Sequence, residues 1–469
     1  MNEAPYESTK PAELKNPANI KLRKIFTRRD IGSFALTDTA VLFIAFIAGV
    51  GLSPWSKQLL SSGEIYFTAA VQSLLTVLIG VGLQNYEIKR RFKLVSIIGG
   101  QLAAVALAGV LSIGFTYLGF YSTFGRLGAI YGSVSSYVAL CLIKLVVRNI
   151  TISSPLRVGF LGESSLSKDV TAHLNEPGRL FQTGKPFLDT HTLSNENAVR
   201  SILDHALANR ISIIAVSSEM TSDANFIEFA FRCSELGIDV TTDVDFYSIF
   251  FEKLPVDHLT KEALAGFGFL RENHLFDFLK RSFDIISASL ALAVLSPFFL
   301  LIMALIKLTS KGPVFFIQPR MGRRLIPFEM IKFRTMYVED SKEDASGGFT
   351  KAGDVRVTTA GKLLRPLHLD ELPQLINIIK GDMSVVGPRP EATGFARSMH
   401  SRIPFYYLRY MSRPGLTGHA QISMGYAMDN VDDTKEKLSY DFYYLTRKSF
   451  LNDLKIILQT VFHLAKGAR

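Results

Sequence analysis

Residues 280–311 read KRSFDIISASLALAVLSPFFLLIMALIKLTSK. The apolar run inside this segment, from Phe283 to Leu308, is longer than the roughly 20 residues that a helix needs to cross a bilayer. Two basic residues open the segment and two lysines close it, so both ends carry the positive charge typical of the cytoplasmic side. The segment therefore predicts a membrane helix, with 275–310 as its bounds.

Ser296 and Pro297 stand at the centre of this run. A proline there removes a helix hydrogen bond and clashes with the preceding turn. A helix bent at this point can enter one leaflet and return to the same face, and its freed backbone groups then need Ser296 or covering protein as partners. The alternative is an ordinary fifth span, which would place everything after it outside the cell. The charges on both flanks favour the re-entrant helix.

Four further apolar stretches precede this segment, at about 34–52, 65–83, 94–120 and 127–147. Each is near or above the spanning length. Buried core helices are the less favoured interpretation, because the runs are nearly free of charge. Basic residues gather before the first stretch, between the second and third, and after the fourth. The positive-inside rule therefore predicts four transmembrane helices over 31–150, with both ends in the cytoplasm, after a cytoplasmic tail over 1–30.

The composition also indicates a membrane protein. The mean hydropathy is +0.21, and 52 Lys and Arg residues stand against 42 Asp and Glu, a formal net charge of +10. A basic excess suits anionic lipid headgroups or nucleic acid. Without a recognition-helix or zinc-finger pattern, we expect lipid and no nucleic-acid partner. Cys141 and Cys233 have no partner at metal-ligand spacing and are not expected to form a disulfide.

Residues 155–262 read as a soluble α/β module. Strands and helices alternate along it, which is typical of a parallel sheet, and the strands are predicted at 157–162, 211–216 and 238–240. Gly159 and Gly162 do not complete the G-x-G-x-x-G pattern that cradles a dinucleotide phosphate. A Rossmann-like module with a structural role is therefore favoured over nucleotide binding.

Asp370 and Glu371 stand side by side in the basic, motif-rich segment 311–469. The sequence Leu-Asp-Glu-Leu-Pro-Gln places both carboxylates at a helix start, where acidic residues and proline are favoured. Plain helix capping would explain an isolated pair of this kind. The functional interpretation is that neighbouring carboxylates point in different directions, so that one attacks a phosphorus atom while the other holds Mg²⁺.

Four cations in the same segment suit a phosphate-bearing substrate. Lys332 and Arg334 alternate along a predicted strand and so share one face; a solvated strand face would show the same pattern. Arg389 lies between two prolines that limit its backbone, and a rigidly presented guanidinium suits phosphate recognition. A plain proline turn is the alternative there. Arg320 adds a fourth cation.

Residues 280–469 resemble the bacterial sugar transferases, which are polyprenyl-phosphate hexose-1-phosphate transferases. The matching motifs are Lys280-Arg-Ser-Phe-Asp284, Ser296-Pro297, Gly312-Pro-Val-Phe-Phe316, Lys332-Phe-Arg-Thr-Met336, Leu369-Asp-Glu-Leu-Pro373, Gly381-Asp-Met-Ser-Val-Val-Gly-Pro-Arg-Pro390 and Pro414-Gly-Leu-Thr-Gly418. Four spans followed by an α/β insert resemble the long form of these enzymes. The chain's ending resembles the exopolysaccharide branch.

The resemblance implies a phosphoglycosyl transferase catalytic domain of the monotopic type over 311–469, with a re-entrant helix kinked at Ser296-Pro297. It implies that Asp370 is the nucleophile and that Glu371 binds Mg²⁺. Two departures stand out. His368 occupies a position where the family often has serine, and Ser423-Met424-Gly425 occupies one where many members have an Asn-Gly-Arg-like stretch. The second departure leaves the identity of the sugar open.

The predicted architecture is a membrane protein with an N-terminal four-helix transmembrane unit, a central Rossmann-like α/β module, and a C-terminal α/β catalytic domain with a re-entrant membrane helix. We expect it in the bacterial inner membrane, with the catalytic domain facing the cytoplasm. Homo-oligomerisation is left open.

The predicted activity is transfer of a hexose-1-phosphate from a nucleotide sugar, with UDP the expected carrier, to polyprenyl (undecaprenyl) phosphate through a phospho-aspartate. This would be the first membrane step of exopolysaccharide or O-antigen synthesis. Two alternatives remain: a membrane-bound NAD-dependent sugar dehydratase and a non-enzymatic scaffold for polysaccharide assembly. The first would need an intact glycine fingerprint with a nearby Tyr-x-x-x-Lys, and 155–262 has neither.

Overall fold

The computed structural model describes most of the chain. The described residues are 31–52, 63–83, 85, 96–120, 126–152, 156–162, 164–174, 181–183, 193, 195–259, 264, 274–337, 356–424 and 430–465. They form two compact units, the first within 31–80 and 85–155 and the second within 81–84 and 156–469. The predicted tail over 1–30 and Gly425 of the second family departure lie outside the described residues.

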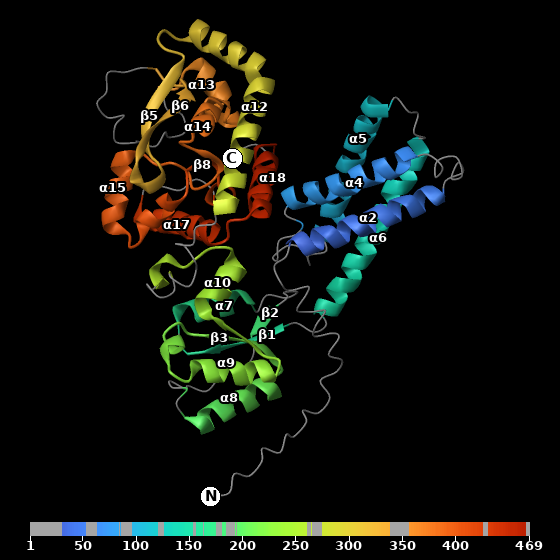
Figure 1. Ribbon diagram of the computed structural model, residues 1–469, viewed down its shortest axis with the longest axis vertical. Coiled ribbons are helices and arrows are strands. Elements are labelled where there is room, and N and C mark those ends of the chain that lie inside the picture. Colours follow the sequence, from blue (N-terminus) through green and yellow to red (C-terminus); the bar gives the residue numbers. More distant parts are fainter. Residues whose placement is uncertain are drawn as a thin grey trace, which may run out of the picture. The chain divides into compact units, whose positions relative to one another are not determined.

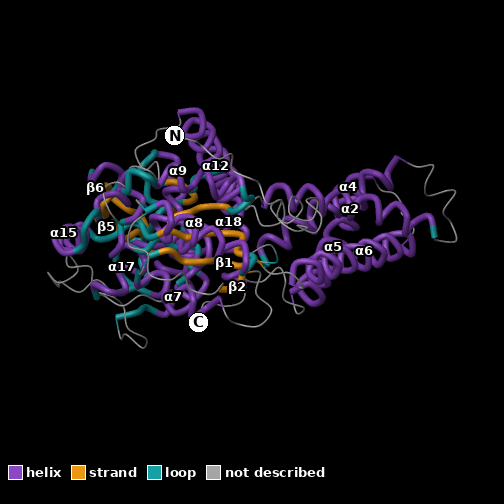
Figure 2. Tube along the Cα trace, turned by 90° about the horizontal axis from the view of Figure 1, so that it is seen from below, coloured by secondary structure: helices purple, strands orange, loops and turns teal. Residues whose placement is uncertain are grey.

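The first unit consists of helices that coincide with the four apolar stretches. They are α2 (Ile31–Gly51), α4 (Gly63–Gly82), the π-helical turn η1 (Ser96–Gly100) with α5 (Gln101–Phe120) directly after it, and α6 (Arg126–Ile152). Figure 2 shows these helices gathered into one bundle.

Small and polar residues let these helices pack closely. At Gly132 of α6 a Cβ would lie 2.6 Å from the ring of Phe46 in α2, a close approach typical of helix pairs in membranes. The Gln72 amide of α4 donates to Ser133 Oγ of α6 (2.7 Å) and accepts from Ser112 Oγ of α5 (3.4 Å). Such interhelical hydrogen bonds satisfy polar groups that lipid cannot satisfy.

Among the described residues, three helical segments are long and apolar enough to cross a membrane: Ile65–Gly82, Ile130–Asn149 and His274–Thr309. The apolar parts of the other two long helices, Leu36–Gly51 and Ile97–Ser112, are shorter. The protein is a membrane protein, as its hydropathy predicts.

The second unit begins with a four-stranded parallel sheet (Figure 1). Its strands are β1 (Leu156–Leu161), β2 (Phe181–Thr183), β3 (Ile211–Val216) and β4 (Asp239–Thr242), in the order β2-β1-β3-β4. Its helical elements are α7 (Ser165–Leu174), α8 (Glu196–Ala208), η2 (Met220–Ser222), α9 (Phe226–Glu235), α10 (Asp243–Phe251) and η3 (Val256–His258). Figure 1 shows α8 and α9 on one side of the sheet and α7 and α10 on the other. Both faces are covered, as in most parallel sheets.

Alternating strands and helices are confirmed in this module. The strand predicted at 211–216 is β3, and those predicted at 157–162 and 238–240 lie within two residues of the observed bounds. The sequence did not predict β2, because a strand of three residues carries too few positions for a periodic signal.

The residues after α10 contact the C-terminal part of the same unit. The Glu252 carboxylate lies 3.1 Å from Lys455 Nζ, and the Glu252 carbonyl lies 3.0 Å from Nε2 of His419. The Leu254 N–H donates to the Ser439 carbonyl (2.9 Å). These bonds dock the α/β module on the C-terminal domain.

The predicted helix over 275–310 is α12 (His274–Thr309), and Figure 1 shows that it is bent. Pro297 lies inside it and cannot donate a hydrogen bond to the carbonyl of Ala293 four residues earlier. The Ser296 hydroxyl donates to that carbonyl instead (2.8 Å). Of the two partners expected for this carbonyl, Ser296 or covering protein, the structure shows Ser296.

The remaining elements build the C-terminal domain. β5 (Phe315–Met321) and β6 (Pro327–Phe333) form an antiparallel hairpin, and β7 (Ser384–Val386) and β8 (Gly415–Thr417) form a short parallel pair. The helical elements are η4 (Arg323–Leu325), α13 (Thr359–Leu364), η6 (Arg365–Leu367), η7 (Leu369–Glu371), α14 (Gln374–Lys380), α15 (Thr393–Arg402), η8 (Tyr406–Met411), α16 (His419–Ser423), α17 (Val431–Thr446) and α18 (Phe450–Ala465).

This domain is built on α12. Ile302 of α12 belongs to a buried cluster with Phe333 of β6, and Leu369 and Leu372 pack against that cluster. Ala288, further toward the start of α12, belongs to a second cluster that contains residues of β6 and α14. The elements on either side of Asp370 and Glu371 are therefore fixed directly on the membrane helix.

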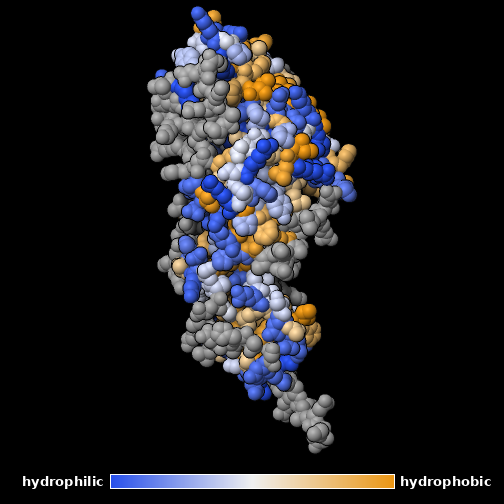
Figure 3. Space-filling view, turned by 90° about the vertical axis from the view of Figure 1, so that its left-hand side faces the viewer, coloured by the Kyte–Doolittle hydropathy of each residue, from blue (hydrophilic) through white to orange (hydrophobic). Residues whose placement is uncertain are grey.

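Much of α12 outside this core is apolar and exposed. The exposed side chains include Leu275, Phe278, Leu279, Ile286, Leu290, Val294, Phe298, Leu300, Leu301 and Leu308. Figure 3 shows apolar side chains gathered toward the upper end of the view, next to hydrophilic ones. An exposed apolar surface of this extent is typical of a membrane contact.

Candidate active site

Asp370 and Glu371 lie in η7, one tight turn ahead of α14. His368, the residue before η7, has a left-handed backbone conformation (φ +53). This conformation ends η6 and redirects the chain. On either side of the pair, Leu369 and Leu372 pack against the core of α12. The predicted position of both carboxylates at a helix start is confirmed, and His368 occupies the sharp turn that precedes them.

Two cations hold Glu371. Arg389 Nη2 lies 2.6 Å from Glu371 Oε1, Arg389 Nη1 lies 3.3 Å from Oε2, and Lys332 Nζ lies 3.0 Å from Oε1. Burial by itself raises the pKa of Glu371, but the charges of Arg389 and Lys332 outweigh it and hold that pKa far below its usual range. Glu371 is therefore an anion at neutral pH.

Asp370 has a different environment, although it is also buried. Burial raises the pKa of Asp370, and the charge of Lys332 acts in the opposite direction. Within the described part of the chain, no neighbouring side chain donates a hydrogen bond to this carboxylate. A backbone N–H does donate to it, but this lowers the pKa less than burial raises it. A carboxylate with a raised pKa that no cationic side chain holds by a hydrogen bond is the more available nucleophile of the two.

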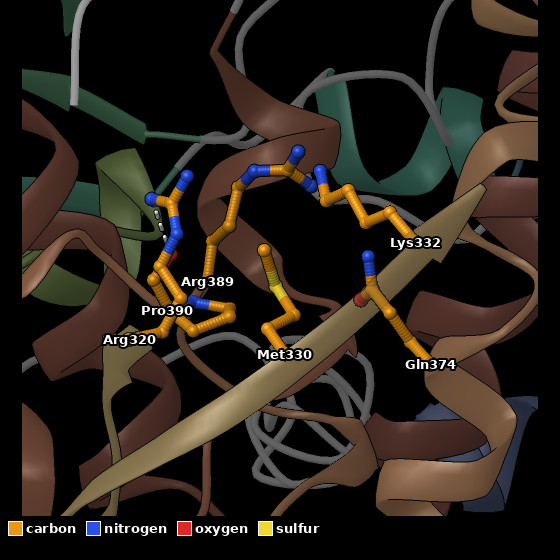
Figure 4. Close-up of a pocket in the computed structure, with 6 residues that line it drawn as sticks. All are labelled: Arg320, Met330, Lys332, Gln374, Arg389 and Pro390. Carbon is orange, nitrogen blue, oxygen red and sulfur yellow. Dashed lines mark hydrogen bonds between the residues drawn. The ribbon is translucent and has the colours of Figure 1, made fainter. Parts of the chain in front are cut away.

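A small pocket lies beside the pair, lined by Arg320, Met330, Lys332, Gln374, Arg389 and Pro390. Figure 4 shows the guanidinium of Arg389 and the ammonium of Lys332 reaching toward one another above Met330, with Arg320 on the other side. Arg320 donates to the Pro390 carbonyl (3.4 Å); burial, with the Arg389 charge adding to it, lowers its pKa to about 10. Three cations at one pocket suit a substrate with several phosphate oxygens.

The backbone around Arg389 is fixed by its neighbours in β7 and β8. The Gly387 N–H donates to the Thr417 carbonyl, and the Gly415 N–H donates to the Pro388 carbonyl, both at 2.9 Å. A Cβ on Gly387 would lie 2.9 Å from the Gly415 nitrogen, so this crossing needs glycine. The turn therefore presents Arg389 rigidly, as its two flanking prolines predicted.

The placement of Arg334 on the substrate face was wrong. β6 ends at Phe333, so the alternation that faces Lys332 toward Glu371 does not extend to Arg334. The buried guanidinium of Arg334 donates to the carbonyl of Ser310 (3.0 Å) and the carbonyl of Lys311 (2.7 Å). It binds carbonyls at the end of α12, where a cation is favoured, and belongs to the structural frame.

Two residues near the pair were not predicted from the sequence. Gln374 lines the pocket, and its place one helical turn after Glu371 was the available signal. Arg365 acts on Asp370, where its positive charge opposes the rise in pKa caused by burial. Arg365 lies five residues before Asp370, a spacing that gives no helical or strand signal, so only the turn at His368 reveals its proximity.

The donor set of the pair suits Mg²⁺. This ion prefers carboxylate oxygens and usually completes its shell with water and substrate phosphates rather than with an all-protein cage. Among the described residues, no group of three His, Cys, Asp or Glu side chains could hold a metal. Asp370 and Glu371 supply two hard oxygen ligands next to a pocket for phosphate, which fits the substrate-completed kind of site.

Known proteins resemble this chain over the region that carries the site. The family model for bacterial sugar transferases matches residues 275–467. The UDP-N-acetylgalactosamine-undecaprenyl-phosphate N-acetylgalactosaminephosphotransferase of Aeromonas hydrophila is 36% identical over 298 residues, which cover 62% of this chain and 69% of that protein.

Two further relatives match the C-terminal part. The UDP-glucose:undecaprenyl-phosphate glucose-1-phosphate transferase of Caulobacter vibrioides is 42% identical over 186 residues, covering 39% of this chain and 69% of that protein. The exopolysaccharide production protein ExoY of Rhizobium meliloti is 41% identical over 199 residues, covering 39% of this chain and 83% of that protein.

These similarities favour a transferase over the dehydratase and the scaffold. The matched region, 275–467, contains Asp370, Glu371 and the cations that surround them. The chain belongs to the bacterial sugar transferase family and is a phosphotransferase.

Proposed function

We propose that this protein transfers a hexose-1-phosphate from a UDP-sugar to undecaprenyl phosphate, as the first membrane step of exopolysaccharide or O-antigen synthesis. The observation that carries this proposal is a pair of carboxylates with different environments, fixed on the apolar helix α12. Lys332 and Arg389 hold Glu371, whereas Asp370 accepts no side-chain hydrogen bond within the described part of the chain. The printed names of the relatives support the donor and acceptor classes. Those names differ in the sugar, so the hexose stays open.

The proposed reaction has two phosphoryl-transfer steps. In the first, an Asp370 oxygen attacks the sugar-bearing phosphorus, the bond from that phosphorus to the bridging oxygen breaks, and uridine monophosphate leaves. In the second, an oxygen of the lipid phosphate attacks the same phosphorus, and the Asp370 carboxylate leaves. Two displacements of this kind give ping-pong kinetics, and the raised pKa of Asp370 supports its role as the nucleophile.

Charge neutralisation is the main task of the surrounding residues, because phosphoryl transfer depends on positioning and electrostatics. Arg389, Lys332 and Arg320 border the pocket in which we place the donor diphosphate. Glu371 holds the first two of these cations in the free protein. When the donor binds, its phosphate oxygens would become alternative acceptors for Arg389 and Lys332. Because these two side chains are already held at the pocket, they would need to move little.

Mg²⁺ is the cofactor that we propose, with Glu371 as its principal protein ligand and Asp370 beside it. When bound, the ion would supply positive charge at the phosphate oxygens of the donor. Glu371 already forms ion pairs with Arg389 and Lys332. Binding of Mg²⁺ at this carboxylate would therefore be coupled to a switch of both cations from Glu371 to the donor phosphates.

We further propose that α12 is re-entrant and that the catalytic domain faces the cytoplasm of the inner membrane. Support comes from the bend of the helix, from the Ser296 hydroxyl that donates to the carbonyl left free by Pro297, and from basic residues at both ends. An acceptor with a long polyprenyl tail stays in the bilayer, so the nucleophile has to lie at the membrane surface. Four spans in 31–150 and a Rossmann-like module over 155–262 complete the proposed topology.

The deciding experiment compares Asp370→Asn with the wild-type protein in detergent or nanodiscs. Wild-type protein given UDP-sugars without lipid should release about one equivalent of uridine monophosphate and gain the mass of a sugar-phosphate. Asp370→Asn should do neither, and its transfer to undecaprenyl phosphate should fall on the order of a thousandfold or more. Asp432→Asn, an exposed carboxylate in the first turn of α17, is the matched control. Near wild-type transfer by Asp370→Asn would refute the mechanism.

A further inference from the structure

A cluster of charged side chains, most of them buried, begins at the residue after Pro390, which lines the pocket. It consists of Glu391, which follows the Arg389-Pro390 turn, Tyr406 and Arg409 of η8, and Lys437 and Asp441 of α17. Arg409 is among the largest fully buried side chains of the described residues. Two cations and two anions offset each other here, so the cluster adds no net charge to the domain.

Arg409 is the hub of this cluster. Its Nη1 lies 2.6 Å from Glu391 Oε1 and 2.8 Å from the Tyr406 hydroxyl, and its Nη2 lies 2.8 Å from Asp441 Oδ2. Tyr406 in turn donates to Glu391, and Lys437 Nζ lies 2.6 Å from Glu391 Oε1. Burial lowers the pKa of Arg409, but the charges around it outweigh burial and raise that pKa above its usual value.

One bond leads from this hub to the active site. Arg409 Nη2 donates to the backbone carbonyl of Arg389 (3.2 Å), the residue whose side chain holds Glu371. Arg409 also binds the Glu391 side chain, two residues further along the same turn. The other side of the turn is fixed by β5, because the Met321 N–H donates to the Glu391 carbonyl (2.9 Å).

We propose that Arg409 is a positioning residue for the donor-binding cation Arg389, acting through the backbone of the Pro388–Glu391 turn. The inference rests on the proposed function and deepens it. Arg409 does not line the pocket. Its guanidinium sets where the Arg389 backbone lies, and a displacement of about 1 Å at a charged group of this kind costs up to about a hundredfold in rate.

The burial of three charges, with Lys437 half-buried beside them, costs free energy through desolvation. Replacing a buried ion-pair cluster by apolar side chains is often neutral or stabilising, so stability alone does not account for this arrangement. A planar guanidinium offers several donors in fixed directions, and Arg409 uses them to tie η8, α17 and the Arg389 turn together. An apolar core would leave the Arg389 carbonyl without this donor.

The test is a double-mutant cycle of Arg409→Lys and Arg389→Ala, with the KM for the UDP-sugar, kcat and Tm measured for all four proteins. Lysine keeps the charge but loses the fork that reaches both Glu391 and the Arg389 carbonyl. In the wild-type background we expect Arg409→Lys to lower kcat/KM on the order of tenfold to a hundredfold. In the Arg389→Ala background the same change should alter kcat/KM less than about twofold, because its target is already absent.

Arg447→Lys is the matched control, since Arg447 at the end of α17 donates to Ser248 of the α/β module and not to the turn. Should Arg409→Lys fail to fold, Tyr406→Phe removes the hydroxyl that Glu391 and Arg409 share and enters the same cycle. If the substitution lowered kcat/KM by the same factor in the wild-type and Arg389→Ala backgrounds, Arg409 would act on the fold in general. The proposal would then be wrong.

A second readout needs no catalysis. Backbone hydrogen exchange in the peptide over 387–393 should accelerate several-fold in Arg409→Lys and stay unchanged in Arg447→Lys. Unchanged exchange in both variants would overturn the positioning role even if no transferase activity were found. Accelerated exchange in a protein that transfers no sugar-phosphate would support the positioning role and count against the proposed function, so the two failures are distinguishable.

Discussion

The Arg389 guanidinium lies 2.6 Å from the Glu371 carboxylate, although their elements are otherwise separate: Glu371 precedes α14 and Arg389 follows β7. Lys332 of β6 completes the arrangement at 3.0 Å. Because all three charges are held in one place before any substrate is bound, the electrostatics of the site are preorganised.

Replacing Glu371 by glutamine should reduce both activity and stability. The amide cannot neutralise Lys332 and Arg389, which would then repel each other, and we expect transfer to fall on the order of a hundredfold or more. The free energy of unfolding should fall by about 1–3 kcal/mol, less than for a fully buried pair because Arg389 is 37% exposed. Transfer assays and denaturant unfolding measure the two effects. An active, equally stable Glu371→Gln protein would contradict the pairing.

Replacing Lys332 by methionine should move the acid limb of the pH–rate profile. The proposed mechanism requires ionised Asp370, whose pKa burial raises and Lys332 lowers. Activity should therefore rise with pH through a pKa above the ordinary aspartate value, and Lys332→Met should shift that limb to higher pH. Profiles of kcat/KM between pH 4 and 8 test this. Lys380→Met, exposed at the end of α14, serves as the control and should leave the limb in place.

Replacing Arg334 should affect the fold and not the donor. Arg334 is buried and binds carbonyls at the end of α12, so Arg334→Met leaves these acceptors unpaired. We expect the free energy of unfolding to fall by about 1–3 kcal/mol, with the KM for the UDP-sugar within about twofold of wild type. A large rise in KM with unchanged stability would contradict this and would mean that Arg334 binds the substrate.

Acid should weaken the docking of the α/β module through His419. Burial lowers the pKa of His419 to about 4, and its Nε2–H donates to the Glu252 carbonyl. The unfolded chain binds a proton near pH 6.5 and the folded chain only near pH 4, so stability is complete above pH 6.5 and is lost as the pH falls toward 4. The loss amounts to about 3 kcal/mol for one fully buried histidine.

The corresponding measurement is denaturant unfolding between pH 4 and 7.5. His419→Gln keeps a donor for the Glu252 carbonyl but does not titrate, so its stability should change less over this range. His463→Gln, at a histidine in α18 outside this contact, is the control. If His419→Gln and wild-type protein lost stability equally, the pH dependence would have another source.

Replacing Pro297 by leucine tests the re-entrant helix. Leucine restores the helix hydrogen bond and removes the clash that bends the chain, so a straightened α12 would reach the far side of the bilayer. We expect a cytoplasmic reporter fused after 469 to change its accessibility in Pro297→Leu but not in Ala293→Leu. A wild-type fusion that is already accessible from outside would refute the cytoplasmic orientation.

The sequence by itself determined the membrane helix, the parallel module and the adjacent carboxylates proposed to react. Each follows from a local rule: the length of an apolar run, the alternation of strands and helices, or two adjacent carboxylates at a helix start. Ser296 and Pro297 are neighbours in the chain, so the bond that compensates for the proline was predictable as well.

Only the tertiary structure decided which cations lie at the candidate site. Lys332 and Arg334 are equivalent by alternation, yet β6 ends between them, and Arg334 turns to the end of α12. The bond from Arg409 to Arg389 joins residues 20 positions apart in different elements. No periodicity encodes such contacts, because they arise where separate elements meet in the folded chain and are fixed by packing rather than by local propensity.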